Sequence, residues 1–209
     1  QKSMDERLGD ADRAGLSGVE RFMKHYFLTA KTAGDLTRIY CAYLEDEHKR
    51  KPRLRIPRFG LNKRKIGDFH IEGSRITLRS ARLIKDDPVN LIRIFHVAQS
   101  HDLDIHPRAL RFIRQNLNLV NLQLQKNPEA NQLFMGILTY EKGPGFALRM
   151  MNEAGIFGKF IPDFGRVVAQ MQYDMYHVYT VDEHTIRAIE LLSQVERGLL
   201  AEDHPLAND

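Results

Sequence analysis

The chain has few of the residues that mark secreted and membrane proteins. Its 209 residues include one cysteine and no tryptophan. A single thiol excludes an internal disulfide, and we expect Cys41 to be a small, buried, apolar residue on a helix. No apolar run approaches the ~20 residues that cross a bilayer, and the N-terminal residues include no hydrophobic signal region. We therefore expect a cytoplasmic protein with no membrane partner.

The chain also lacks several signatures of catalysis. It has no glycine-rich phosphate loop, no nucleophile elbow, and no histidine-aspartate dyad followed by a further aspartate. Its composition is that of a globular protein, with 43% hydrophobic residues. A chain of this length suits one large domain or two small ones. From these patterns alone, the activity stays unassigned.

Positive charge is concentrated in one stretch. Between Lys49 and Lys65 there are nine basic residues and no acidic one, a pattern that suits contacts with phosphate or nucleic acid. The stretch also contains two prolines and a glycine, and it follows an acidic cluster that would partly neutralise it. We interpret residues 51–66 as a solvated basic connector, with nucleic-acid binding as the weaker alternative.

A long amphipathic helix is predicted within residues 1–50. Ser17 and Glu20 form a capping box, in which each side chain satisfies a backbone N–H at the helix start. We predict a core helix, which Gly34 could interrupt because glycine costs about 1 kcal/mol relative to alanine. Its apolar side chains recur at helical spacing: Val19, Phe22, Met23, Phe27, Ala30, Ala33, Leu36, Ile39, Tyr40 and Tyr43.

The clearest strand signal lies at about residues 68–79. Two short runs alternate apolar and polar residues, and Gly73-Ser74 between them suits a two-residue type II′ turn. A lone hairpin is marginal by itself, so we expect helices to cover one of its faces. The predicted fold class is mainly α, a helical bundle-like domain with one small β-hairpin.

Proline and glycine mark the helices that follow. Three helices are predicted to begin where a capping residue precedes a proline at the first helical position: Asp87-Pro88, His106-Pro107 and Asn127-Pro128. A later short helix should end at Gly155, and another short element is expected at residues 157–164. The last helix should begin after Thr180, which forms a capping box with Glu183, and its apolar stripe would be Ile186, Ile189, Leu192 and Val195.

The nine histidines are candidates for a metal site. His96, His101 and His106 form a regular series, but a spacing of five residues rotates around a helix. Pro107 also places them on different elements, so we predict no site there. Four isolated histidines are predicted to be surface or capping residues: His25, His48, His70 and His204.

The remaining pair, His177 and His184, lies in a segment rich in possible ligands. Asp182 and Glu183 stand beside His184, so imidazole and carboxylate groups could converge on a divalent ion. The alternative is structural, because acidic residues in the first turn of a helix are favoured by the helix dipole. Both readings stay open on the residues alone.

Three longer runs resemble one enzyme family. They are VERFMKHYFLTAKTAGDLTRIYCAYLEDE, DDPVNLIRIFHVAQSHDLDIHPRALRFIRQNL and, most specifically, IPDFGRVVAQMQYDMYHVYTVDEHTIRAIELL. The chain thereby resembles the bifunctional uridylyltransferase/uridylyl-removing enzymes of the nitrogen-regulatory PII protein. The resemblance extends from Gly15 or earlier through Leu206.

The resemblance implies a division into domains. Such enzymes consist of a nucleotidyltransferase domain, a helical PII-uridylyltransferase region, an HD-type phosphohydrolase domain and two ACT domains. Residues 1–50 would then be a helix that follows the nucleotidyltransferase domain, whose signature is not found here. Residues 67–165 would be the helical region with its hairpin, and residues 166–209 the start of the HD domain.

The resemblance also implies the chemistry. His184 matches the first metal ligand of an HD site, whose ion, Mg²⁺ or Mn²⁺, activates water for attack on phosphorus. The other ligands are not in this sequence, so we expect no bound metal and no activity from these 209 residues alone.

The implied partners are those of nitrogen regulation. The whole enzyme would attach UMP from UTP to PII when glutamine is low and remove it when glutamine is high. The alternative is a stand-alone helical interaction module without catalysis.

Overall fold

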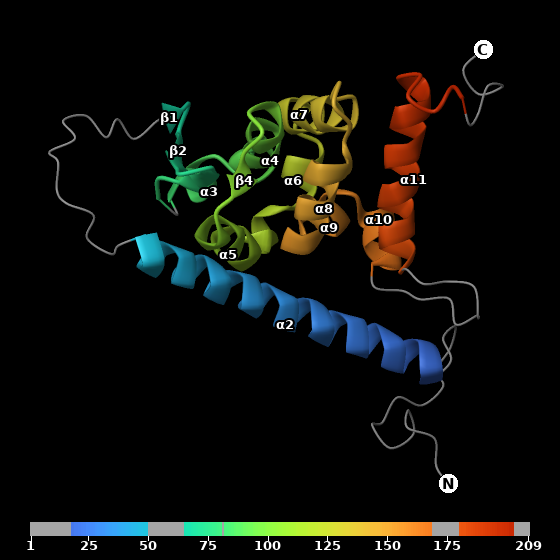
Figure 1. Cartoon of the computed structure of the whole chain (residues 1–209), viewed down its shortest axis with the longest axis horizontal. Coiled ribbons are helices and arrows are strands. Elements are labelled where there is room, and N and C mark those ends of the chain that lie inside the picture. Colours follow the sequence, from blue (N-terminus) through green and yellow to red (C-terminus); the bar gives the residue numbers. More distant parts are fainter. Residues whose placement is uncertain (1–17, 50–64, 81, 169–179, 203–209) are drawn as a thin grey trace, which may run out of the picture.

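The computed structural model describes residues 18–49, 65–80, 82–168 and 180–202. These residues are mainly helical with one small sheet, which confirms the predicted fold class. Figure 1 shows a central group of short helices with the sheet at one end and α11 (Val181–Glu196) at the other, while α2 (Gly18–Lys49) runs alongside. Within the described ranges, no helix is both long enough and apolar enough to span a bilayer.

The hydrophobic core lies among the central helices. α4 (Asn90–Ser100) is buried on nearly all sides, with Leu91, Ile94 and Phe95 fully inaccessible, as expected for a helix that other elements surround. It packs against α7 and α8. The other short helices around it are α3 (Arg82–Asp86), α5 (Pro107–Gln115), η1 (Leu117–Leu119), α6 (Leu122–Gln125), α7 (Pro128–Leu138), α8 (Gly145–Ala154), α9 (Ile156–Phe160) and α10 (Pro162–Val167).

The long N-terminal helix exists, but it is not part of the core. α2 continues without interruption through Gly34 for 32 residues, and it contacts α5. Tyr26, Leu36 and Tyr40 are exposed, so the prediction of a core helix is wrong. Cys41 is likewise exposed rather than buried. Apolar residues do recur along α2, but their spacing does not show which other parts of the protein cover them. The capping residue Ser17 lies outside the described residues.

The predicted hairpin forms, but it is not alone. β2 (Phe69–Glu72) pairs antiparallel with β3 (Arg75–Leu78), and Glu72 lies opposite Arg75 across Gly73-Ser74. Gly73 has φ +64°, whereas Ser74 is not among the residues with positive φ, which agrees with a type II′ turn and not with type I′.

Two further strands complete a sheet of order β1-β2-β3-β4. β1 (Lys65–Ile66) pairs with β2, and β4 (Asp104–Ile105) runs parallel to β3. The expectation of a lone hairpin is therefore wrong. Each added strand is two residues long, too short to show an alternating pattern, and β1 takes the end of the segment interpreted as a connector. The rest of that segment lies outside the described residues.

Two of the three proline-preceding caps are confirmed. The His106 ring Nδ1 accepts a hydrogen bond from the Arg108 N–H at 3.1 Å, and Asn127 Oδ1 accepts from the Ala130 N–H at 3.0 Å. The third helix, α4, begins at Asn90 instead of Pro88. Bonds from the N–H of Asn90 to the carbonyl of Asp87 and from Leu91 to Pro88 span only three residues, so this start is a tighter turn.

The C-terminal helices follow the predicted punctuation with small differences. α8 ends at Gly155, whose φ of +78° is the left-handed conformation expected of a C′ glycine. The short element expected after it is two helices, α9 and α10. Thr180 does precede α11, although its side chain makes no capping hydrogen bond. Of the predicted stripe, Ile186 is buried and Leu192 is exposed.

Two glycines allow α9 and α10 to cross closely. A Cβ atom at Gly165 would lie 2.2 Å from the carbonyl oxygen of Gly158, which is backbone and cannot swing away. The crossing is completed by Phe157 and Phe164, whose rings stack with centroids 3.8 Å apart. The glycine contact shows that the two backbones touch, and the ring stacking adds a side-chain contact beside it.

We predict that Gly165→Ala lowers the free energy of unfolding of the chain by about 1–3 kcal/mol, the usual cost of overpacking. Gly34→Ala is the matched control, because a Cβ there meets nothing within 4 Å and alanine favours a helix interior. Urea unfolding of both variants tests this. A Gly165→Ala protein as stable as the wild type would contradict the crossing.

Candidate functional site

His184 lies in the first turn of α11. Its backbone N–H donates to the carbonyl of Thr180 at 3.0 Å, which starts the helix, and its side chain is exposed. α11 packs against α8 and α10, so the end of the helix that carries His184 is held against the body of the protein. The imidazole is thus presented at the surface from a packed helix.

The neighbouring Asp182 points into the protein. Its side chain is 4% exposed, and its carboxylate accepts a hydrogen bond from Asn152 Nδ2 of α8 at 2.8 Å. A buried carboxylate is costly unless donors satisfy it, and a bond to a charged acceptor is stronger than one between neutral groups. Asp182 therefore fixes the start of α11 against α8.

A second polar contact joins the same two helices. Arg149 of α8 donates from Nη1 and Nη2 to the two carboxylate oxygens of Glu190, at 2.8 and 3.4 Å. The hydrogen bond to Glu190 is the largest cause of the raised pKa of Arg149, and partial burial opposes it. A Cβ at Gly145 would lie 2.5 Å from Glu190 Cδ, so this carboxylate sits against the first turn of α8, where the helix dipole favours negative charge.

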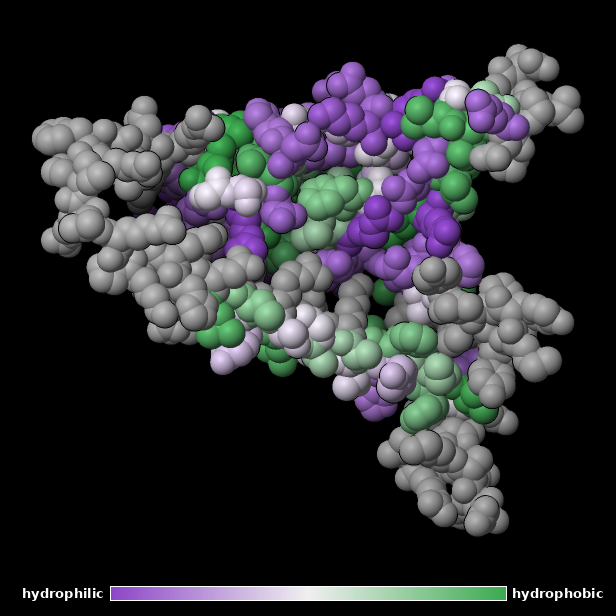
Figure 2. Space-filling model, viewed as in Figure 1, coloured by the Kyte–Doolittle hydropathy of each residue, from purple (hydrophilic) through white to green (hydrophobic). Residues whose placement is uncertain are grey.

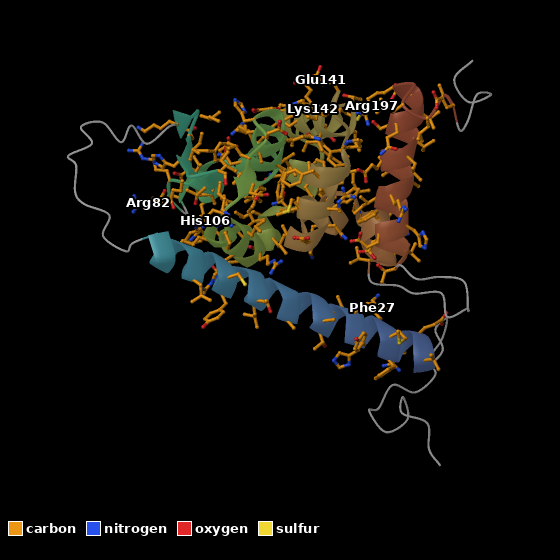
Figure 3. All side chains as sticks on the ribbon, in the orientation of Figure 1. Phe27, Arg82, His106, Glu141, Lys142 and Arg197 are labelled. Atoms are coloured by element: carbon orange, nitrogen blue, oxygen red, sulfur yellow. The ribbon has the colours of Figure 1, made fainter. Side chains whose placement is uncertain are left out.

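The far end of α11 is attached by Arg197. Its Nη1 donates to the carbonyl of Glu141 at 3.1 Å and its Nε to the carbonyl of Ser193 at 3.0 Å. Figure 3 shows Arg197 at the end of α11 beside Glu141 and Lys142. α11 is therefore held to the body at three places along its length.

The described residues do not form a complete metal site. Among them, no three histidine, cysteine, aspartate or glutamate side chains lie close enough together to hold an ion. His177 and His204 lie outside the described residues. The donor set found here is a single imidazole, and one imidazole does not fit a divalent cation, which needs several ligands.

The series His96, His101 and His106 is divided among different tasks. His96 lies on α4 against Gly136 of α7, His101 follows α4 and its ring contacts the Val97 carbonyl, and buried His106 caps α5. Burial, and then the charge of His101, lower the pKa of His96. The three histidines therefore lie at separate places in the fold, and the absence of a metal site among them stays a prediction.

A groove lies between α2 and the central helices. It has a volume of about 810 Å³, and Figure 2 shows the surface hollowed there. Leu28 and Thr32 line it from α2, and Arg114, Lys159 and Arg166 line it from the body. Sequence reasoning missed this groove because its lining residues come from several elements, with no local spacing to reveal them.

A smaller cavity of about 280 Å³ lies beside the sheet. Its rim is closed by an ion pair between Lys142 Nζ and Asp102 Oδ2 at 2.9 Å, which raises the pKa of Lys142. Asp102 has the left-handed φ of +51°. The buried Gln99 amide lines the cavity and donates to the carbonyls of Ile137 and Gly143, so it connects the loop after α7 to α4.

Comparison with known proteins identifies the chain's relatives. Residues 69–160 match the family described as uridylyltransferase GlnD third domain. Over its full length, the chain is 56% identical in sequence to part of a bifunctional uridylyltransferase/uridylyl-removing enzyme of Azospirillum brasilense, and it covers 23% of that enzyme. It is 53% identical to part of an enzyme of the same name from Rhodospirillum rubrum, of which it covers 22%. The chain is thus similar over its full length to enzymes of this name, and its residues 69–160 match a domain family of such enzymes. No solved structure matches it.

These matches confirm the resemblance to uridylyltransferase/uridylyl-removing enzymes that the sequence runs indicated. The chain spans less than a quarter of the length of these relatives. The matched family domain, residues 69–160, covers strands β2 to β4 and the helices from α3 through α9, and β1 precedes it. α2 and α11, with His184, lie outside that domain on its two sides.

We predict that Asn152 and Asp182 are energetically coupled. A double-mutant cycle with Asn152→Ala and Asp182→Ala should give a coupling of about 1.5–3 kcal/mol in the free energy of unfolding, because one partner of the bond is charged. Additive effects of the two substitutions would show that the contact does not hold α11.

His96 should make stability fall in acid. Because its folded pKa lies below the ordinary value of 6.5, protonation favours the unfolded chain, and stability is lost as pH falls below 6.5. Between about pH 7 and pH 5, the free energy of unfolding of His96→Gln should decline less than that of the wild type. Equal slopes in urea unfolding would contradict this.

Proposed function

We propose that the chain is the central segment of an enzyme that attaches UMP from UTP to the PII signal protein and removes it again in response to glutamine. The proposal rests on the similarity of the whole chain, at 56% and 53% identity, to enzymes named for both reactions. In it, residues 1–50 follow a nucleotidyltransferase domain, and the basic connector is the part of residues 51–66 that precedes β1 at Lys65. Residues 67–165 are the helical uridylyltransferase region, and residues 166–209 begin an HD domain.

His184 is the residue that this segment contributes to the chemistry of UMP removal. Its exposed position at the start of a well-attached helix supports this role. In the whole enzyme, His184 would be one ligand of a site for Mg²⁺ or Mn²⁺, which supplies water activation and charge neutralisation at phosphorus. Because the described residues offer one imidazole, the other ligands would have to come from elsewhere in the enzyme.

The rest of the segment acts as a rigid support. The two helices at its ends are joined by a packed core, and α11 is attached to that core by directional polar contacts. A support of this kind can hold two catalytic regions apart and offer part of the surface that binds PII. By the same proposal, the 209 residues alone catalyse neither reaction, and the enzyme works in the cytoplasm.

We predict that His184→Ala in the full-length enzyme reduces hydrolysis of PII-UMP by at least about 100-fold, since even residues that only support a metal ligand are worth 10–100-fold. Transfer of UMP to PII should stay close to wild type. Release of UMP from labelled PII-UMP, and incorporation of UMP from UTP, measure the two reactions separately.

The control is His25→Ala, which removes an exposed histidine of α2 and should leave both reactions unchanged. Undiminished hydrolysis by His184→Ala would defeat the metal-ligand role. A full-length protein that neither adds nor removes UMP would instead support the alternative, an interaction module without catalysis.

A further inference from the structure

One face of α2 is apolar and, among the side chains that the structure describes, uncharged and partly or fully exposed. Successive residues of a helix are about 100° apart, and on that basis roughly half of the circumference of α2 carries no charged side chain among those described. The residues of this face, which we call the open face, are Val19, Phe22, Met23, Tyr26, Ala30, Ala33, Leu36, Thr37, Tyr40, Cys41 and Leu44.

Three large side chains of the open face are exposed, whereas Val19, Phe22, Met23 and Leu44 are partly buried. Tyr26, Leu36 and Tyr40 are 56%, 64% and 62% exposed, and Cys41 is exposed as well. Figure 2 shows hydrophobic residues at several places along this helix. Contiguous exposed apolar surface of this kind marks an interaction site.

The open face is not the side of α2 that meets the body of the protein. Leu28 and Thr32 line the groove between α2 and the central helices. Tyr26 lies about 160° around the helix from Leu28. The described charged residues Glu20 and Lys24 lie on the other half of the helix from Tyr26. The exposed side chains Tyr26, Leu36 and Tyr40 of the open face therefore lie away from the residues by which α2 lines the groove.

We propose that the open face is the docking surface for the catalytic uridylyltransferase domain that precedes it in the full-length enzyme. The relatives are more than four times as long as this chain, so most of the enzyme is available to cover it. This inference rests on the proposed function in one respect, because a longer enzyme must supply the domain.

Chain connectivity favours that domain over a second copy. Residues 1–17 can reach at most about 60 Å, and a 32-residue helix is about 48 Å long, so a domain attached before α2 can reach the whole face. Attachment within one chain gives an effective concentration on the order of millimolar, which a second molecule at micromolar concentration does not match.

Cys41 reports on the open face without any substitution. We expect a thiol reagent to modify Cys41 at least about 10-fold more slowly in the full-length enzyme than in the 209-residue chain, with peptide-resolved mass spectrometry as the readout. Equal rates would overturn the proposal. A 209-residue chain that is dimeric by light scattering and protects Cys41 would assign the face to a second copy, and would overturn it too.

Two variants of the full-length enzyme test the same surface with Cys41 retained. Tyr40→Glu places a charge on the open face and should restore fast labelling. Lys24→Glu changes the opposite side and should keep labelling slow, and equal labelling of the two variants would overturn the proposal. Transfer of UMP to PII is measured in parallel: transfer with an open Cys41 defeats this inference alone, whereas a protected Cys41 without transfer defeats the proposed function alone.

Discussion

The position of α11 depends on the buried hydrogen bond from Asn152 to Asp182. α11 has little apolar surface in contact with the core, where Ile186 is its one buried hydrophobic residue. Apolar contacts are not directional, so a helix with few of them needs polar contacts to fix its rotation. The Asn152–Asp182 bond places the first turn, two residues before His184, and the contacts of Arg149 and Arg197 place the rest.

This arrangement explains how a helical segment can serve catalysis that it does not complete. α8 is at once a core helix, through Leu148 and Met151, and the partner of α11. The exposed end of α11 is therefore attached, through α8, to the packed centre of the protein. α2, which runs alongside the central helices (Figure 1), carries the exposed apolar residues that we propose as a docking surface.

Local chemistry predicted the helix boundaries well and the surroundings poorly. The caps at His106 and Asn127, and the glycine end at Gly155, each depend on a few consecutive residues, so the sequence reveals them. Burial of α2 and Cys41 depends on which other residues cover them, and periodicity carries no such information. β4 was missed because a strand of two residues is defined by its partner β3 and not by its own sequence.

The candidate site divides in the same way. The place of His184 one turn into a helix follows from Thr180 and the apolar spacing after it. The burial of Asp182 does not, because its partner is 30 residues earlier in the chain. Acidic residues in a first turn look alike in sequence, whether they face solvent, a metal or a buried amide, and only the packing of α8 against α11 decides among these.

The most direct measurement is the ratio of UMP removal to UMP transfer in full-length enzyme carrying Asn152→Ala. If the Asn152–Asp182 bond positions His184 for hydrolysis, removal should fall at least about 10-fold, the usual effect of losing a group that orients a metal ligand, while transfer persists and shows that the protein is folded. An unchanged ratio would contradict the claim that α8 sets the position of His184.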